Sequence, residues 1–119
     1  MNILILEDDL ETLSLIFKVL LETKIDFVPV VLSTYEQVER LINPSDMTFD
    51  LILLDRDCAL CGSFHTLDIE KFGADKVIGI SSVPEYNNAL LGRGVKKIIT
   101  KDYKKLDEFV SRLLVTLLA

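Results

Sequence analysis

Two short apolar runs, each closed by acidic residues, restrict the fold more than any other feature of the sequence. Residues 3–6 read Ile-Leu-Ile-Leu and lead into three acidic residues that begin with Glu7. Residues 51–54 read Leu-Ile-Leu-Leu and lead into Asp55. Apolar runs without alternating polar positions are typical of strands buried on both faces of a parallel sheet. The sequence therefore predicts an α/β fold with helices on both faces of such a sheet.

The acidic residues after these runs are expected to meet at one edge of the sheet. If the two strands are parallel neighbours, Glu7, Asp8 and Asp55 converge at the carboxyl ends, where open α/β sheets bind ligands. Carboxylates this close oppose each other's ionisation unless they hold a cation, and an all-oxygen set suits Mg²⁺. Asp9 has the simpler alternative role of capping the helix that follows.

Two later apolar runs end in a hydroxyl and an amine. Residues 77–80 lead into Ser81, and residues 98–100 lead into Lys101. An aspartate that attacks phosphorus needs its own charge and that of the phosphoryl oxygens neutralised, which Mg²⁺ and an ammonium group achieve, and a hydroxyl donates to a further oxygen. Acids, a hydroxyl and an amine at four strand ends therefore predict a phosphoryl site.

With these motifs, the chain resembles the CheY-like receiver domain of two-component response regulators, which takes a phosphoryl group from a histidine kinase onto an aspartate. The resemblance covers the whole chain and matches the family in the order and spacing of the motifs. It implies that Asp55 is the phosphoacceptor. The implied metal ligands are Glu7 through water, Asp8, Asp55, and Asp57 through its backbone carbonyl, and the implied phosphoryl-binding and switch residues are Ser81 and Lys101.

The resemblance also implies an architecture and a function. The expected fold is a flavodoxin-like, doubly wound (βα)5 sandwich with a five-stranded parallel sheet in the order 2-1-3-4-5. Residues 1–119 are expected to form one receiver domain without an output domain. The implied role is signal transduction in a phosphorelay, by a phosphoprotein that switches protein partners and is not a turnover enzyme. The expected partners are a histidine kinase or phosphotransfer protein and a downstream protein target.

The composition agrees with a single signalling domain. Of the 119 residues, 50% are hydrophobic and 27% are charged, which suits one folded core and excludes wholesale disorder. The net charge of −6 argues against direct binding of nucleic acid, whose affinity comes largely from phosphate neutralisation. No apolar run approaches the roughly 20 residues of a membrane-spanning helix. A cytoplasmic location without membrane contact is expected.

The hydrophobic periodicity predicts alternating strands and helices. Pro29 indicates that the second strand lies at an edge or carries a bulge, and Ser33 with Glu36 is typical of a capping box. The last helix has a wide apolar stripe, which predicts a homodimer through helix 4, strand 5 and helix 5. Strands are expected at residues 3–6, 25–32, 51–54, 76–80 and 97–100, and helices at residues 10–21, 33–42, 64–72, 85–91 and 106–117.

The chain departs from the receiver pattern near its last strand. Asp102 follows Lys101 where receivers usually have a proline with a cis bond, so the shape of this loop does not follow from the family. Ile98 occupies the position of the aromatic residue that usually swings inward on phosphorylation. Tyr86 and Tyr103 lie outside that position and are interpreted as ordinary helix and loop residues.

The loop after Asp55 leaves several alternatives open. The sequence Asp55-Arg56-Asp57 also matches the D-x-D nucleophile motif of haloacid dehalogenase-like phosphatases, although their other acidic ligands follow the lysine. By analogy, the side chain of Asp57 is expected to speed dephosphorylation. A pseudo-receiver that binds partners without phosphorylation is a third interpretation. The residues Cys58, Cys61 and His65 have a spacing suited to zinc or to a redox dithiol, but free thiols are the simpler interpretation.

Overall fold

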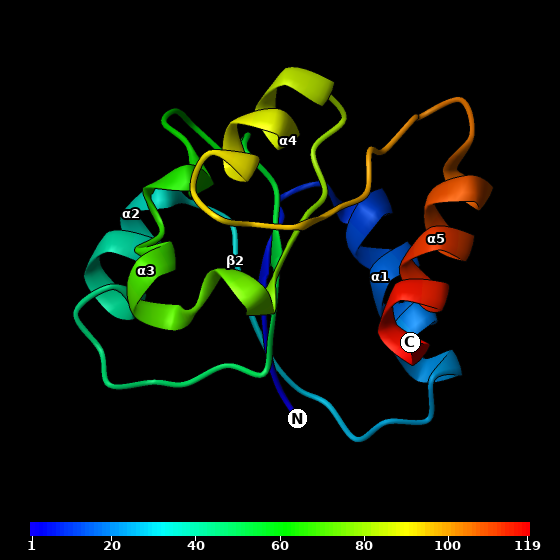
Figure 1. Ribbon diagram of the computed structural model, residues 1–119, viewed down its shortest axis with the longest axis horizontal. Coiled ribbons are helices and arrows are strands. Elements are labelled where there is room, and N and C mark those ends of the chain that lie inside the picture. Colours follow the sequence, from blue (N-terminus) through cyan, green and yellow to red (C-terminus); the bar gives the residue numbers. More distant parts are fainter.

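The computed structural model describes residues 1–119 and contains a five-stranded parallel sheet in the order β2-β1-β3-β4-β5. The predicted fold class and strand order are confirmed. Helices α1 and α5 cover one face of the sheet, and α2, α3 and α4 lie on the other side (Figure 1). The strands are β1 (Asn2–Leu6), β2 (Val28–Leu32), β3 (Leu51–Leu54), β4 (Val77–Gly79) and β5 (Lys97–Ile98). The α-helices are α1 (Leu10–Glu22), α2 (Tyr35–Gln37), α3 (Ile69–Phe72), α4 (Pro84–Leu91) and α5 (Leu106–Leu118).

The sheet separates two hydrophobic cores. Successive side chains of a strand point to opposite faces, so Leu4 and Leu6 of β1 pack on the α2–α3 side. Ile3 and Ile5 pack on the α1–α5 side. All four side chains are fully buried, and each contributes about 1.5–3 kcal/mol through removal of apolar surface from water. Burial on both faces explains why the strand has no polar position before Glu7.

Polar side chains mark where the first two helices begin. The carboxylate of Asp9 accepts hydrogen bonds from the backbone N–H of Thr12 at 3.0 Å and from its hydroxyl at 2.6 Å, and these contacts hold the pKa of Asp9 below its usual range. The predicted cap of α1 is thus confirmed. The predicted capping box before α2 was wrong by one residue: Thr34 and Gln37 form it, not Ser33 and Glu36. After α2 the backbone continues as a π-helix, Val38–Ile42.

Several element bounds differ from the predicted ones. The second strand begins at Val28 because the chain turns out of α1 at Thr23 and Lys24, with Lys24 at φ +58°, and residues 25–27 have no regular structure. The predicted helix at 64–72 is divided into a 3-10 turn, Phe64–Thr66, and α3, which ends at Gly73. The last strand is shorter than predicted, but backbone hydrogen bonds to the chain after β4 continue as far as Lys101.

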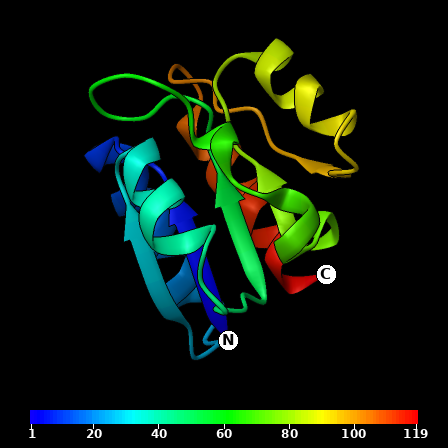
Figure 2. The same cartoon turned by 90° about the vertical axis from the view of Figure 1, so that its left-hand side faces the viewer.

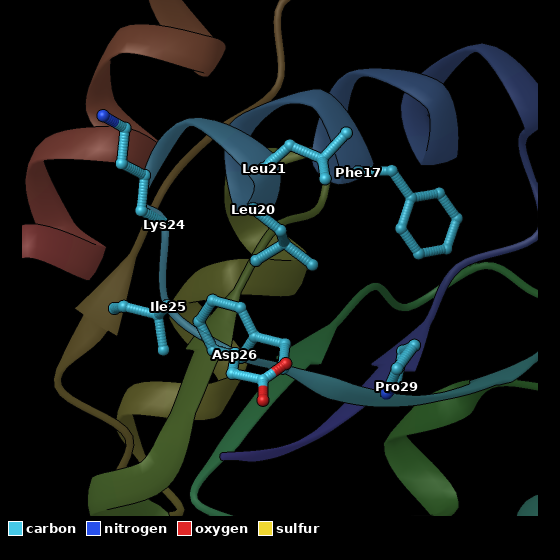
Figure 3. Close-up of a pocket in the computed structure, with 8 residues that line it drawn as sticks. Phe17, Leu20, Leu21, Lys24, Ile25, Asp26 and Pro29 are labelled. Atoms are coloured by element: carbon cyan, nitrogen blue, oxygen red, sulfur yellow. The ribbon is translucent and has the colours of Figure 1, made fainter.

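A pocket of about 560 Å³ lies away from the carboxyl ends of the strands. It opens between the second half of α1 and the start of β2, with Phe17 and Leu21 on one side and Pro29 on the other (Figure 3). None of the predicted site residues lines it. Separately, the structure has no helix with the length and apolar character needed to span a bilayer.

Candidate functional site

The ends of four strands bring the predicted site residues together. Leu6 of β1 pairs with Leu54 of β3, so Glu7 and Asp55 leave neighbouring strands at the same level. Carboxylate oxygens of Glu7, Asp8 and Asp55 lie within 4.8 Å of one another. The loops after β3 and β5 and the start of α4 rise from this edge of the sheet (Figure 2).

Lys101 is the buried cation of this acidic cluster. Its Nζ lies 2.5 Å from Oε1 of Glu7 and 3.3 Å from Oδ2 of Asp55. The side chains of Lys101 and Glu7 are each 1% exposed, so the ion pair is shielded from water. The backbone N–H of Lys101 donates to the carbonyl of Ser81 at 3.1 Å, which fixes the amine beside the hydroxyl-bearing strand end.

The acidic cluster carries more negative charge than one lysine balances. Burial raises the pKa of Glu7 to about 7, and the nearby Asp55 adds to the increase, although Lys101 opposes it. Burial also raises the pKa of Asp55. Burial lowers the pKa of Lys101, but the two carboxylates outweigh this and raise it, so the amine stays charged. A divalent cation bound by the carboxylate oxygens would relieve this imbalance, and Mg²⁺ matches the donor set.

Ser81 is held by an asparagine that the sequence analysis did not single out. The backbone N–H of Ser81 donates to Oδ1 of Asn87 at 3.0 Å, and Nδ2 of Asn87 donates to the Ser81 carbonyl at 3.1 Å. The same amide donates to Oγ1 of Thr100 at 3.4 Å, and both Ser81 and Asn87 are 1% exposed. Asn87 therefore ties α4 to the ends of β4 and β5. The sequence signal that could have identified Asn87 is a polar residue on the inner face of α4, a helix with only a weak apolar stripe.

The side chain of Asp57 lies outside the acidic cluster. Its Oδ1 accepts a hydrogen bond from Nη1 of Arg56 at 2.9 Å, and the Asp57 side chain is 58% exposed. The guanidinium of Arg56 also stacks over the ring of Tyr86 in α4, 4.5 Å from the ring centroid. The backbone N–H of Arg56 donates to Oδ1 of Asp55 at 2.8 Å. The cation–π contact between Arg56 and Tyr86 places a second cation beside the site, and the sequence analysis missed this contact.

The three residues considered for zinc are not brought together. The thiol of Cys58 donates to the backbone carbonyl of Cys61 at 3.0 Å, and both cysteines are free. Nε2 of His65 is buried without a hydrogen-bond partner, and burial, aided by the charge of Arg93, lowers the pKa of His65 to about 4. Potential ligands gather only in the acidic cluster, so the structure does not form the zinc site.

The loop after Lys101 adopts its shape without a cis peptide bond. Oδ1 of Asp102 accepts a hydrogen bond from the backbone N–H of Lys104 at 2.9 Å, so this carboxylate stabilises its own turn. The ring centroid of Tyr103 lies 5.9 Å from Nζ of Lys101. The Asp102 carboxylate therefore faces its own loop, and Glu7 and Asp55 are the carboxylates paired with the buried amine.

A five-stranded doubly wound sheet with an acid, hydroxyl and amine site at its carboxyl edge defines a flavodoxin-like α/β domain. The chain has the fold of response regulator receiver domains. It is similar to the Mn²⁺-bound form of response regulator Rcp1, with a TM-score of 0.79 and 19% identity over 98% of this chain and 94% of that chain. A receiver domain from Rhodospirillum rubrum gives a TM-score of 0.70 and 18% identity over 100% of this chain and 95% of that one.

A third similar structure is the BeF3-activated N-terminal receiver domain of Klebsiella pneumoniae RstA, with a TM-score of 0.65 and 23% identity over 98% of each chain. No protein-family model matches the sequence, and no curated protein matches it. At these identities the similarity establishes the fold alone.

Proposed function

We propose that the protein is a phosphoacceptor receiver domain that takes a phosphoryl group onto Asp55 and thereby changes its protein partner. The observation that carries this proposal is the buried triad of Glu7, Asp55 and Lys101 at the carboxyl edge of the sheet. Burying three ionisable groups is costly, and such groups gather where their chemistry is used. Structures similar to this chain include metal-bound and BeF3-activated receivers, which supports the same interpretation.

In the proposed reaction, a carboxylate oxygen of Asp55 attacks the phosphorus of a phosphorylated histidine or a small phosphodonor. A bond forms between Asp55 and phosphorus as the bond to the donor's leaving atom breaks, which gives an acyl phosphate. Lys101 exchanges its contact with Glu7 for a phosphoryl oxygen. The Oγ of Ser81 accepts the N–H of Val83 at 3.1 Å, so its hydroxyl proton is free to donate to another phosphoryl oxygen.

The acidic cluster is suited to hold Mg²⁺ through Asp8 and Asp55, through Glu7 by way of water, and through the backbone carbonyl of Asp57. When bound, Mg²⁺ would neutralise charge on the carboxylate and the transferred group. Oxygen atoms of the three carboxylates lie within 4.8 Å of one another, which supports this assignment. The cation also offsets the cost of burying the charged carboxylates of Glu7 and Asp55, whose pKa values burial raises.

The decisive experiment is intact-mass spectrometry after treatment with acetyl phosphate and Mg²⁺. The parent protein should gain one phosphoryl group, and Asp55→Asn should gain none. Asp50→Asn is the matched control, because Asp50 lies at the opposite end of the same strand. Equal labelling of Asp55→Asn and the parent would refute the assignment. Absence of labelling in the parent would favour a pseudo-receiver that binds partners without phosphorylation, and fast turnover of para-nitrophenyl phosphate would favour a D-x-D phosphatase.

The proposed partners are a histidine kinase or phosphotransfer protein and a downstream protein target in the cytoplasm. The homodimer predicted through α4, β5 and α5 remains part of this proposal. The outer side of α5 carries Val115, which is 69% exposed, and Leu118, which is 59% exposed. Light scattering with and without Mg²⁺ and beryllofluoride tests the dimer, and a monomeric mass in both conditions would contradict it.

A further inference from the structure

Arg56 connects the phosphoacceptor strand end to α4. Its backbone N–H contacts Asp55, while its guanidinium contacts Asp57 at 2.9 Å and lies 4.5 Å from the ring centroid of Tyr86. Tyr86 lies in the first turn of α4, directly after the loop that carries Ser81. One side chain thus bridges the acidic edge of the sheet and a helix on the surface.

The contacts of Arg56 are weak enough to be exchanged. The side chain is 38% exposed and Asp57 is 58% exposed, so solvent screens their ion pair to a value within about 1 kcal/mol. A cation–π contact at an exposed site adds about 0.5–1 kcal/mol. A phosphoryl group carries more negative charge than a carboxylate and presents several oxygens to the planar donors of an arginine.

We propose that Arg56 is a phosphoryl-sensing residue that leaves Asp57 and Tyr86 and binds the phosphoryl oxygens when Asp55 is phosphorylated. This inference rests on the proposed function of Asp55. The backbone of Arg56 stays in place during the exchange, because its carbonyl accepts the N–H of Phe64 at 2.9 Å. Only the long, flexible side chain has to move. Its departure exposes the face of the Tyr86 ring at the start of α4.

The other contacts of α4 explain why this release affects one end of the helix. At the inner face, Asn87 holds Ser81, so an inward movement of Ser81 toward the phosphoryl group pulls on the same turn. Beyond the far end of α4, Arg93 donates to the carbonyls of His65 at 2.7 Å and Leu67 at 2.8 Å. The first turn therefore loses its contact with Arg56 but stays linked to Ser81 through Asn87, and the segment after the last turn keeps its contacts through Arg93.

Fluorine NMR of protein labelled with 3-fluorotyrosine tests the release directly. The chain has three tyrosines, so Tyr→Phe variants assign each resonance. When Mg²⁺ and beryllofluoride saturate the parent, the resonance of Tyr86 should move to the position that it has in free Arg56→Gln. The resonance of Tyr35, whose ring lies beside Gly62, is the internal control, because the guanidinium of Arg56 stacks on the ring of Tyr86. A Tyr86 resonance that keeps its position in the saturated parent would overturn the proposal.

The affinity for beryllofluoride provides a second test, because substitutions of Arg56 and Tyr86 should change it in opposite directions. Arg56→Gln should weaken binding roughly tenfold through the lost charge-assisted hydrogen bonds. Tyr86→Leu should strengthen binding roughly threefold, because the free state loses the contact that holds Arg56 away. Tyr86→Phe keeps the ring face and should match the parent.

The matched charge control is Arg40→Gln, because Arg40 makes an exposed ion pair with Glu36 at 3.6 Å in a different part of the molecule. Equal affinities of Arg56→Gln, Arg40→Gln and the parent would overturn the sensing role alone. If the parent binds no beryllofluoride and gains no phosphoryl mass, the proposed function of Asp55 fails and the sensing role fails with it.

Discussion

Two cations flank Asp55, and their surroundings are opposite. Lys101 follows β5, is 1% exposed and contacts Glu7 and Asp55 inside the molecule. Arg56 follows β3, is 38% exposed and contacts Asp57 and Tyr86 at the surface. The buried lysine cannot leave without stranding two carboxylates, whereas water can replace each contact of the arginine. The difference indicates that Lys101 maintains the resting site and moves only between buried oxygens, whereas Arg56 can leave its surface contacts altogether in response to added charge.

The largest expected effect comes from removing the buried cation. Lys101→Met leaves Glu7 and Asp55 without a partner, and without Mg²⁺ it should lower the free energy of unfolding by about 3 kcal/mol. Arg56→Met should cost about 0.5 kcal/mol, because its ion pair is exposed. Urea denaturation at neutral pH measures both values, with the exposed Lys104→Met as the control. Similar losses for Lys101→Met and Arg56→Met would break the comparison between the two cations.

The second effect is a dependence of stability on pH that only the buried cluster should produce. Burial raises the pKa of Glu7 from 4.5 to about 7, so the folded protein binds more protons than the unfolded chain between these values. The free energy of unfolding without metal should therefore fall by about 3 kcal/mol as the pH rises through this window to about 8. Glu7→Gln should flatten the curve, and Arg56→Gln should leave it unchanged. A flat curve for the parent would show that burial does not raise the pKa of Glu7.

The third effect concerns the exposed partner of Arg56. When Arg56 binds the phosphoryl group, the carboxylate of Asp57 is free to accept a proton from a water that attacks the acyl phosphate. Asp57→Asn should therefore lengthen the half-life of the phosphorylated protein roughly tenfold at constant Mg²⁺. The exposed Asp46→Asn serves as the control. A half-life that is unchanged or shorter in Asp57→Asn would exclude the base role.

The smallest expected effect tests whether the buried cluster binds Mg²⁺. Asp8→Asn removes one of the three neighbouring carboxylates, so it should raise the free energy of unfolding by about 1 kcal/mol without metal and weaken Mg²⁺ binding. Melting curves with and without millimolar Mg²⁺ measure both changes. If the melting temperature of the parent protein does not change with Mg²⁺, the metal assignment is contradicted.

The sequence predicted the framework of the fold because the strands are buried on both faces. The apolar run at 51–54 has the bounds of β3, and Glu7, Asp55, Ser81 and Lys101 converge as expected. Strand ends were less predictable, because a strand stops where its neighbour stops: β5 pairs only at Lys97 and Ile98 with the short β4. Local polar signals near α2 were ambiguous, because two overlapping pairs of residues both fit a capping box.

The part of the site that the sequence did not predict depends on the placement of α4. Asn87 and Tyr86 meet Ser81 and Arg56 only after the helix has packed across the sheet edge. No local pattern encodes which side of a short helix faces the phosphoacceptor. The choice of Glu7 as the nearest partner of Lys101 is similar, because two carboxylates competed for one amine and the distances decide between them.

Pro29 has a consequence for how molecules of this protein meet. The N–H of Val28 bonds to the carbonyl of Met1 in the direction of β1, so the nitrogen of the next residue faces the open edge of the sheet. A proline nitrogen has no hydrogen to offer there. Exposed edge strands invite intermolecular strand pairing, and a missing donor in the five-residue β2 interrupts that template. Contacts between copies are accordingly expected through side chains, and continuous sheets across β2 are disfavoured at high protein concentration.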